Sequence, residues 1–99
     1  MKPIYLDYNA TTPMAKEVIT AMLPFFNDLF GNPSSTHAYG LEAKKAIENA
    51  RKKVACLLHA HPDEIIFTSG GTEANNLAIK GIAFSMKGRG NHIITCIIR

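Results

Sequence analysis

The stretch from residue 64 to residue 98 most constrains the fold, because two β-prone segments flank a helical one. Residues 64–68 and 92–98 carry contiguous branched and aromatic side chains, a pattern typical of buried strands. Between them, apolar residues recur at helical spacing from about residue 73 to 86, and Gly88 and Gly90 end the run. A strand, a helix and a second strand in this order predict a right-handed βαβ unit of a parallel sheet.

Two helical segments precede this unit. After Pro13, apolar residues at helical spacing predict a helix that Pro24 kinks or ends early. From about residue 38 to 58, apolar residues at steps of three and four predict a long amphipathic helix. A two-stranded parallel sheet leaves open edges and an uncovered face, whereas α/β folds continue the sheet and cover both faces. The expected fold class is therefore α/β, an incomplete parallel sheet with flanking helices.

Composition excludes several classes of protein. With 46% hydrophobic and 19% charged residues, the chain has the balance of a globular protein rather than a disordered one. The net charge of +3 is dispersed apart from one cluster, which favours a solvated helix face; no aromatic residues interleave with it as nucleic-acid stacking requires. We therefore expect no nucleic-acid partner. The cluster comprises Lys44, Lys45, Arg51, Lys52 and Lys53.

Cysteine usage and hydropathy indicate a cytoplasmic setting. Cys56 and Cys96 have no paired spacing, lie in apolar segments, and no secretory segment accompanies them, so reduced thiols are expected. No apolar run approaches the roughly 20 residues of a membrane helix, so no membrane partner is expected. Cys56, His59 and His61 do not match zinc-ligand spacing, and no metal site is predicted.

The junction at residues 65–73 is the best candidate binding site. Helix N-termini present unpaired N–H groups and a positive dipole end, and glycines let an anion approach the main chain. Gly70, Gly71 and Thr72 therefore suit a phosphate, with Thr72 capping the helix and donating its hydroxyl. A plain strand-to-helix turn with a threonine cap explains the same residues equally well. The third glycine of a dinucleotide fingerprint and the lysine of a P-loop are missing, which disfavours nucleotides.

Two other segments have sequences typical of shaped backbone. Residues 4–8 indicate a short extended arm, which the turn and cap residues 9–13 then break. Residues 30–35 are dense in residues that adopt special backbone angles, which predicts an ordered loop. His37, just beyond, suits a helix cap or surface residue, but it also lies where a ligand pocket could use it.

Three motifs in one order establish a family resemblance. Together they resemble the cysteine desulfurases of the NifS/IscS type, within class V of the aminotransferases. The resemblance runs from about residue 4 to residue 95 and corresponds to about the first quarter of a family member. The motifs are Tyr5-Leu6-Asp7-Tyr8-Asn9-Ala10-Thr11-Thr12-Pro13, then Phe30-Gly31-Asn32-Pro33-Ser34-Ser35 with His37, then Phe67-Thr68-Ser69-Gly70-Gly71-Thr72-Glu73 with Asn76-Leu77-Ala78.

The resemblance implies a fold, a cofactor and site residues. It implies the N-terminal part of the fold-type I transferase fold that binds pyridoxal 5′-phosphate. Residues 1–14 would form an extended arm and residues 15–99 the start of the large α/β domain. In the family, positions matching Gly71 and Thr72 bind the cofactor's phosphate. The segments holding Asn9, Thr11, Asn32 and His37 match active-site surroundings and are expected to be pocket walls.

The resemblance also implies an activity and partners. Family members take sulfur from L-cysteine, leaving L-alanine and a persulfide on a catalytic cysteine, and supply iron–sulfur cluster assembly. The family implies a homodimer and a sulfur-acceptor protein. Selenocysteine or another amino acid stays open as the substrate, because the residues that decide it are not in this sequence.

The family's catalytic groups fall beyond residue 99. These are the lysine that bonds the cofactor's aldehyde, the aspartate on its ring nitrogen and the nucleophilic cysteine, which neither Cys56 nor Cys96 matches. Residues 96–99 also depart from the family pattern, which suggests a truncated or frameshifted reading frame or a deliberately shortened chain. We expect no catalytic residue in this chain and no turnover from it alone. A non-catalytic module that binds phosphate or docks on a full-length desulfurase is the alternative, and a poorly folding remnant is a third reading.

Overall fold

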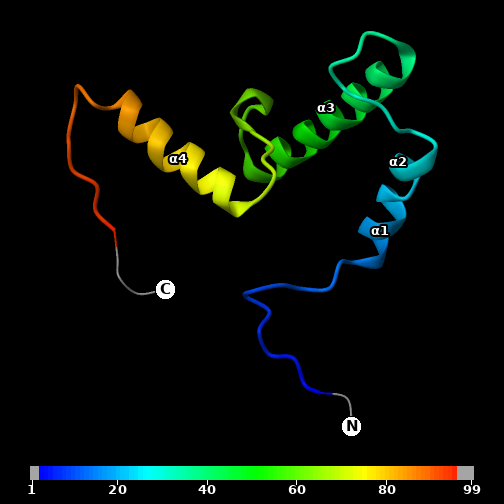
Figure 1. The fold of residues 1–99 in the computed structure, drawn as a ribbon, viewed down its shortest axis with the longest axis horizontal. Coiled ribbons are helices and arrows are strands. Elements are labelled where there is room, and N and C mark those ends of the chain that lie inside the picture. The colour runs from blue at the N-terminus through cyan, green and yellow to red at the C-terminus, as the bar shows by residue number, and fades with distance from the viewer. Residues whose placement is uncertain (1–2, 96–99) are drawn as a thin grey trace. The chain divides into compact units, whose positions relative to one another are not determined.

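The computed structural model describes residues 3–95, and every regular element in that range is a helix (Figure 1). The chain divides into two compact units, Met1–Pro62 and Asp63–Arg99, and each is described by itself. The first unit contains α1 (Lys16–Met22), α2 (Pro24–Asn27) and α3 (Ala38–Leu58). The second contains α4 (Gly71–Ser85), and a short 3-10 turn spans Pro62–Glu64.

The parallel sheet expected from the sequence is not present in residues 3–95, so the α/β prediction is wrong for this structure. Residues 65–68 and 92–95 are irregular rather than strands, and the rest of the second expected strand lies outside the described residues. A strand requires a neighbouring segment that completes the hydrogen-bonded ladder. β-prone residues favour extended backbone but do not specify that neighbour, and sequential strands lie side by side in only about two-thirds of cases.

Pro24 separates α1 from α2, as its place in the sequence predicts. It occupies the first position of α2, where a missing backbone N–H removes no intrahelical hydrogen bond. The Leu23 N–H closes α1 on the carbonyl of Ile19 at 3.1 Å, and the Phe26 N–H opens α2 on the carbonyl of Leu23 at 3.1 Å. The two short helices are therefore joined end to end by one residue.

The long helix α3 confirms the amphipathic helix expected over residues 38–58. His37 caps its start, because its Nδ1 atom accepts a hydrogen bond from the Gly40 N–H at 3.4 Å. His59 ends it in the left-handed conformation at φ 52° and ψ 36°, and the Ala60 N–H returns to the carbonyl of Ala55 at 2.9 Å. Each end of α3 thus carries a local cap.

Buried apolar side chains are small throughout the described residues. Ala43 and Ala55 form the buried apolar set, and Cys56 is an exposed free thiol rather than a core residue. The face of α4 expected to pack inward is open, with Leu77 48% and Ile82 65% exposed. Local hydrogen bonds and caps, rather than a large core, therefore maintain these helices.

Candidate functional site

The start of α4 is a helix N-terminus without a side-chain cap. Gly70 is the N-cap residue, with extended backbone at φ 165° and ψ −178°, and no side chain bonds to the first turn as a cap. The first intrahelical bond runs from the Ala74 N–H to the Gly70 carbonyl at 3.1 Å. The N–H groups of Gly71, Thr72 and Glu73 precede that bond and are the donors that a helix start directs outward. Thr72 lies in the first turn, so the predicted threonine cap is wrong.

The approach to these donors is open. A Cβ atom added to Gly70 or to Gly71 would meet no atom within 4 Å, and both residues are exposed. No glycine among the described residues has a φ in the left-handed region between about +20° and +160°, so backbone geometry does not demand glycine here. What the two glycines provide is open space beside the start of the helix. That space would let an anion approach the main-chain N–H groups.

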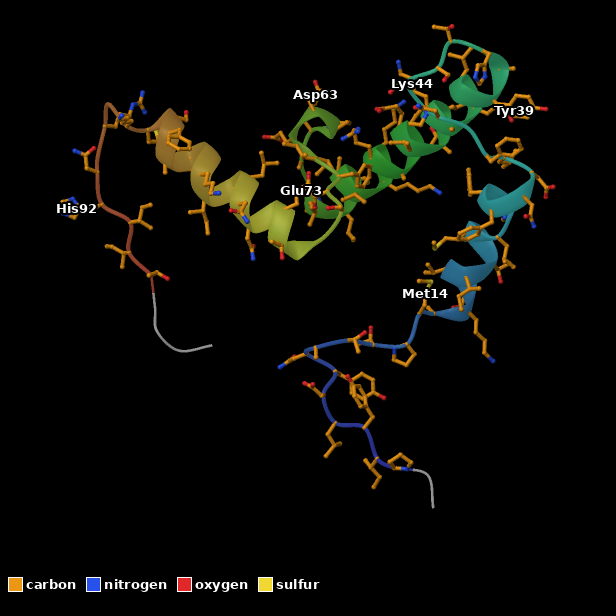
Figure 2. All side chains as sticks on the ribbon, in the orientation of Figure 1. Met14, Tyr39, Lys44, Asp63, Glu73 and His92 are labelled. Atoms are coloured by element: carbon orange, nitrogen blue, oxygen red, sulfur yellow. The ribbon has the colours of Figure 1, made fainter. Side chains whose placement is uncertain are left out.

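Glu73 ties the helix start to the residue before its cap. One carboxylate oxygen, Oε2, accepts hydrogen bonds from both the Ser69 N–H at 2.7 Å and the Ser69 hydroxyl at 2.6 Å. We call this pair the Ser69–Glu73 clamp; Figure 2 shows Glu73 at the first turn of α4. The Ser69 hydroxyl first, and then the Ser69 N–H, hold the pKa of the Glu73 carboxyl below its ordinary value of 4.5, against a smaller effect of desolvation.

Other side chains of the same segment also brace the turn. The Thr68 hydroxyl donates to the Gly70 carbonyl at 3.2 Å, and the Asn76 amide donates to the Thr72 carbonyl at 2.8 Å. Each of these bonds uses a carbonyl as acceptor, so none consumes an N–H group of the first turn. These bonds therefore fix the turn before α4, while no side chain bonds to the N–H groups of its first turn.

Acidification is expected to weaken the Ser69–Glu73 clamp without opening it, because a protonated carboxyl keeps one neutral acceptor oxygen. Because the pKa of Glu73 is lower in the folded chain, the charge-dependent part of the clamp's stabilisation is fully present above the unfolded value of 4.5 and is lost as pH falls through the lower folded value. In an NMR pH titration, the Ser69 amide resonance should move with a midpoint below 4.5. The Glu73→Gln variant is the control and should lack this transition; a midpoint at or above 4.5 in the wild-type chain would contradict the clamp.

Asn32 and His37 meet at one point in the loop before α3. The side-chain oxygen of Asn32, Oδ1, accepts a hydrogen bond from the Ser34 N–H at 2.9 Å. The backbone carbonyl of Asn32 accepts one from the Ser35 N–H at 2.9 Å, and the two bonds close a tight turn. The same Asn32 carbonyl would lie 2.6 Å from a Cβ atom added to Gly40, the residue that His37 caps. The structure therefore brings these two predicted pocket residues together around the Gly40 backbone.

Aromatic rings cover the same loop. The rings of Phe30 and Tyr39 stack with centroids 5.4 Å apart, and the His37 ring meets Tyr39 edge-on at 6.3 Å. A Cβ atom on Gly31 would collide with the carbonyl of Tyr39, so the loop lies directly against the first turn of α3. Since His37 Nδ1 accepts a bond, its neutral ring carries the proton on Nε2 and can donate from there.

Asn9 and Thr11 lie in a separate turn of the N-terminal arm. The Asp7 carbonyl accepts from the Ala10 N–H at 3.0 Å and from the Thr11 N–H at 3.4 Å. The Tyr5 hydroxyl donates to the same Asp7 carbonyl at 2.9 Å. Asn9 and Thr11 are exposed on this turn. Gly71 and Thr72 belong to the other unit, which is described by itself.

Two features at the site do not stand out in the sequence. Glu73 and Gly40 shape the two candidate segments, yet the sequence predicts neither as a site residue. The spacing from Ser69 to Glu73 is one residue longer than the usual capping box, and that spacing together with an acidic first turn is the signal that could have identified the clamp. Nothing in the sequence marks Gly40, because its constraint comes from a loop that returns to it.

Three further features bear on binding. On α3, Arg51 pairs with Glu48 at 3.3 Å and the lysines of the basic cluster are exposed, as on a solvated helix face. In residues 3–95, no three potential metal ligands gather, and no helix combines the length and hydropathy needed to cross a bilayer.

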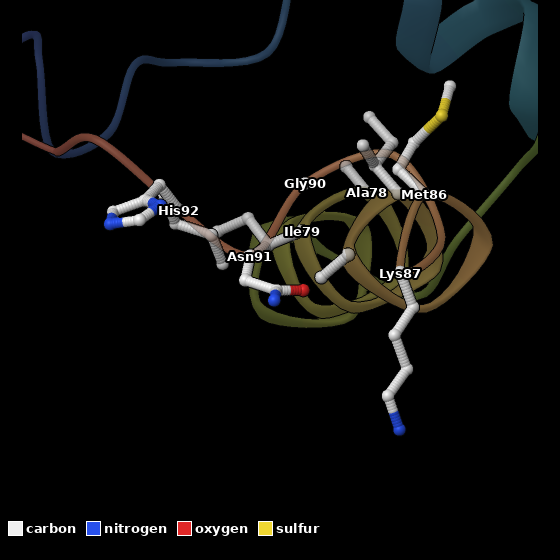
Figure 3. Close-up of a pocket in the computed structure, with 10 residues that line it drawn as sticks. Ala78, Ile79, Met86, Lys87, Gly90, Asn91 and His92 are labelled. Carbon is white, nitrogen blue, oxygen red and sulfur yellow. The ribbon is translucent and has the colours of Figure 1, made fainter.

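An apolar groove with a volume of about 480 Å³ lies along α4, beyond its first turn (Figure 3). The residues that line it include Ala78, Ile79, Ile82, Met86 and residues 90–93.

The donors at the start of α4 fit a phosphate group. N–H groups of the first turn and the Thr72 hydroxyl are neutral donors at the positive end of the helix dipole. The one acidic side chain of that turn, Glu73, directs its carboxylate to Ser69. The helix start therefore suits a phosphate group.

The chain is similar to known cysteine desulfurases over nearly its whole length. "Cysteine desulfurase IscS" of Dictyoglomus turgidum is 60% identical over 94 residues, which cover 95% of this chain and 24% of that protein. The "Probable cysteine desulfurase, mitochondrial" of Schizosaccharomyces pombe is 52% identical over 96 residues, covering 96% of this chain and 19% of that protein. This chain thus spans about a quarter or less of the length of these relatives.

A solved structure extends the similarity to the fold. The structure of a "NIFS-like protein" matches 87% of this chain and 24% of its own, with a TM-score of 0.80 and 42% identity. The resemblance seen in the sequence motifs is therefore confirmed, and the helices described above match part of a NifS-like fold. The family model described as "Aminotransferase class-V" matches residues 4–98, and the chain belongs to this family.

Proposed function

We propose that this chain provides the phosphate-holding segment of a pyridoxal-phosphate-dependent cysteine desulfurase. Such an enzyme converts L-cysteine to L-alanine and leaves a persulfide on its catalytic cysteine. The observation that carries the proposal is the uncapped start of α4, where open space at Gly70 and Gly71 leads to outward N–H donors. Identity of 60% to a cysteine desulfurase over 94 residues supports the family assignment of that segment.

Gly71 and Thr72 are the residues proposed to hold the cofactor. Their N–H groups and the Thr72 hydroxyl would donate to the phosphate, and the dipole of α4 would favour its negative charge. When bound, pyridoxal 5′-phosphate supplies the electron-withdrawing ring on which the amino acid is converted. This chain's part is to bind and orient the cofactor at its phosphate end.

The other segments are proposed to border the substrate. In the whole enzyme, residues 1–14 would be the arm and residues 15–99 the start of the cofactor-binding domain. The turn with Asn9 and Thr11 and the loop with Asn32 and His37 would form pocket walls. His37 has its Nδ1 atom occupied by the Gly40 N–H, so it would face a ligand with Nε2–H as a donor. A second copy of the chain and a sulfur-acceptor protein are the proposed partners, and the cytoplasm the proposed setting.

Calorimetric titration tests the phosphate assignment. Pyridoxine 5′-phosphate and pyridoxine share a ring and lack the aldehyde, so neither can bond to lysines at random. We expect measurable binding of pyridoxine 5′-phosphate, weaker binding of pyridoxine by at least about ten-fold, and competition by inorganic phosphate. Equal affinity for the two compounds would contradict the proposal, because the phosphate would then contribute nothing.

The chain alone is expected to be inactive. The lysine, aspartate and cysteine on which the family's chemistry depends are expected to lie outside this sequence. Incubated with L-cysteine and pyridoxal 5′-phosphate, the purified chain should form L-alanine no faster than the cofactor without protein. Alanine formation clearly above that control would show that residues of this chain perform the chemistry.

A docking module is the second candidate function. The apolar groove along α4, with Ile82 65% exposed, favours a role in which the chain binds a larger desulfurase polypeptide (Figure 3). Co-purification with a full-length desulfurase discriminates it. A tagged full-length desulfurase should retain this chain on a column if docking is its role, and should release it entirely if it is not.

A further inference from the structure

The Ser69–Glu73 clamp differs from an ordinary capping box in which atoms it uses. In a capping box, the N-cap side chain occupies an N–H of the first turn while the glutamate returns to the N-cap N–H. Here the N-cap residue is Gly70, which has no side chain, and the Glu73 carboxylate reaches one residue further, to Ser69. The helix start is therefore fixed in shape while no side chain occupies its first-turn donors.

The clamp is short and charge-assisted. Both bonds from Ser69 end on the same Glu73 oxygen, at 2.7 Å from the N–H and 2.6 Å from the hydroxyl, within the range of strong bonds to a carboxylate. Because it joins Ser69 to Glu73 across Gly70, Gly71 and Thr72, it limits the freedom of two glycines beside whose Cβ positions the structure has open space. Without it, the donors of Gly71 and Thr72 would be spread over more backbone conformations.

We infer that Glu73 is a positioning residue for phosphate, which acts by holding Ser69 and so preorders the Gly70–Gly71 backbone. The inference rests on the proposed function and deepens it. Glu73 has two opposing effects: its hydrogen bonds order the site, whereas its negative charge repels a phosphate. The ordering effect needs only an acceptor oxygen, so a glutamine, which retains that oxygen, separates it from the effect of charge.

The test compares Glu73→Ala, Glu73→Gln and the wild-type chain by calorimetric titration with pyridoxine 5′-phosphate. Glu73→Ala is expected to weaken binding about five-fold, as when an ordering hydrogen bond is lost. Glu73→Gln is expected to restore affinity to the wild-type level or above, because it keeps the acceptor and loses the repulsion. Glu17→Ala, which removes an acidic residue from the first turn of α1, is the matched control for net charge and should bind as the wild type does.

Amide hydrogen exchange at Ser69 and Gly70, without ligand, is the second readout. Exchange should be faster in Glu73→Ala than in the wild-type chain and slow again in Glu73→Gln. The inference is overturned if Glu73→Ala binds as tightly as the wild type, or if Glu73→Gln binds as weakly as Glu73→Ala. If the wild-type chain does not prefer pyridoxine 5′-phosphate over pyridoxine, the proposed function itself fails, which the same titrations reveal separately.

Discussion

Replacing Gly40 by alanine is expected to loosen the loop before α3, although the same change inside a helix usually stabilises it. An added Cβ atom would collide with the Ser35 carbonyl and lie 2.6 Å from the Asn32 carbonyl, so backbone must move. Glycine to alanine in a helix interior usually gains about 0.5–1 kcal/mol. Here we expect a loss of about 1–3 kcal/mol in the local stability of the loop, as for overpacking.

Amide exchange at Ser34 and Ser35 measures this loss, because both N–H groups bond to Asn32 in the closed turn. Gly81→Ala is the matched control, since Gly81 lies within α4 and an added Cβ atom there meets nothing within 4 Å. That variant should gain helicity by circular dichroism. The close approach of the loop to Gly40 would be contradicted if Gly40→Ala gained helicity to the same extent and kept its Ser34 and Ser35 amides protected from exchange.

Replacing Thr72 by valine is expected to weaken binding of pyridoxine 5′-phosphate by on the order of ten-fold to a hundred-fold. Valine keeps the branched shape and the backbone N–H but removes the hydroxyl, a donor to a doubly charged phosphate. Binding of pyridoxine, which has no phosphate, should not change. Affinities of both compounds, measured by calorimetry for the same variant, therefore isolate the hydroxyl's contribution.

Two variants control this measurement. Thr72→Ser keeps a hydroxyl and should restore most of the affinity. Thr20→Val removes the Thr20 hydroxyl, which donates to the Lys16 carbonyl at 3.0 Å in α1, and should leave binding unchanged. If the Thr72→Val chain binds pyridoxine 5′-phosphate as tightly as the wild type, the Thr72 hydroxyl does not donate to the phosphate.

The sequence predicted the helices well because their signals are local. The repeat of apolar residues over 38–58 is enough to define α3, and Pro24 breaks the preceding helix wherever the rest of the chain lies. The prediction of strands was wrong because a strand depends on a partner segment, and the β-prone residues at 65–68 and 92–95 do not specify one. The burial of the inner face of α4 was overestimated for the same reason, since burial also depends on a partner segment.

The candidate site was predictable in part. Gly71 and Thr72 follow from local chemistry and from the family motif, and the structure adds the open approach to them. The Thr72 cap was wrong, because Gly70 is the N-cap residue and Glu73 braces the turn from the far side. The meeting of Asn32 and His37 at Gly40 could not be read from spacing, because it depends on the path by which the loop returns to α3.

The most direct test of the phosphate site is an NMR titration of the isotope-labelled chain with inorganic phosphate, observing each backbone amide. The largest, saturable shifts should fall on the Gly71 and Thr72 amides, with smaller shifts at Glu73 and none at the start of α3, where His37 caps the helix. Shifts spread over the exposed lysines of α3, with Gly71 and Thr72 unmoved, would contradict it and show that phosphate meets only general positive charge.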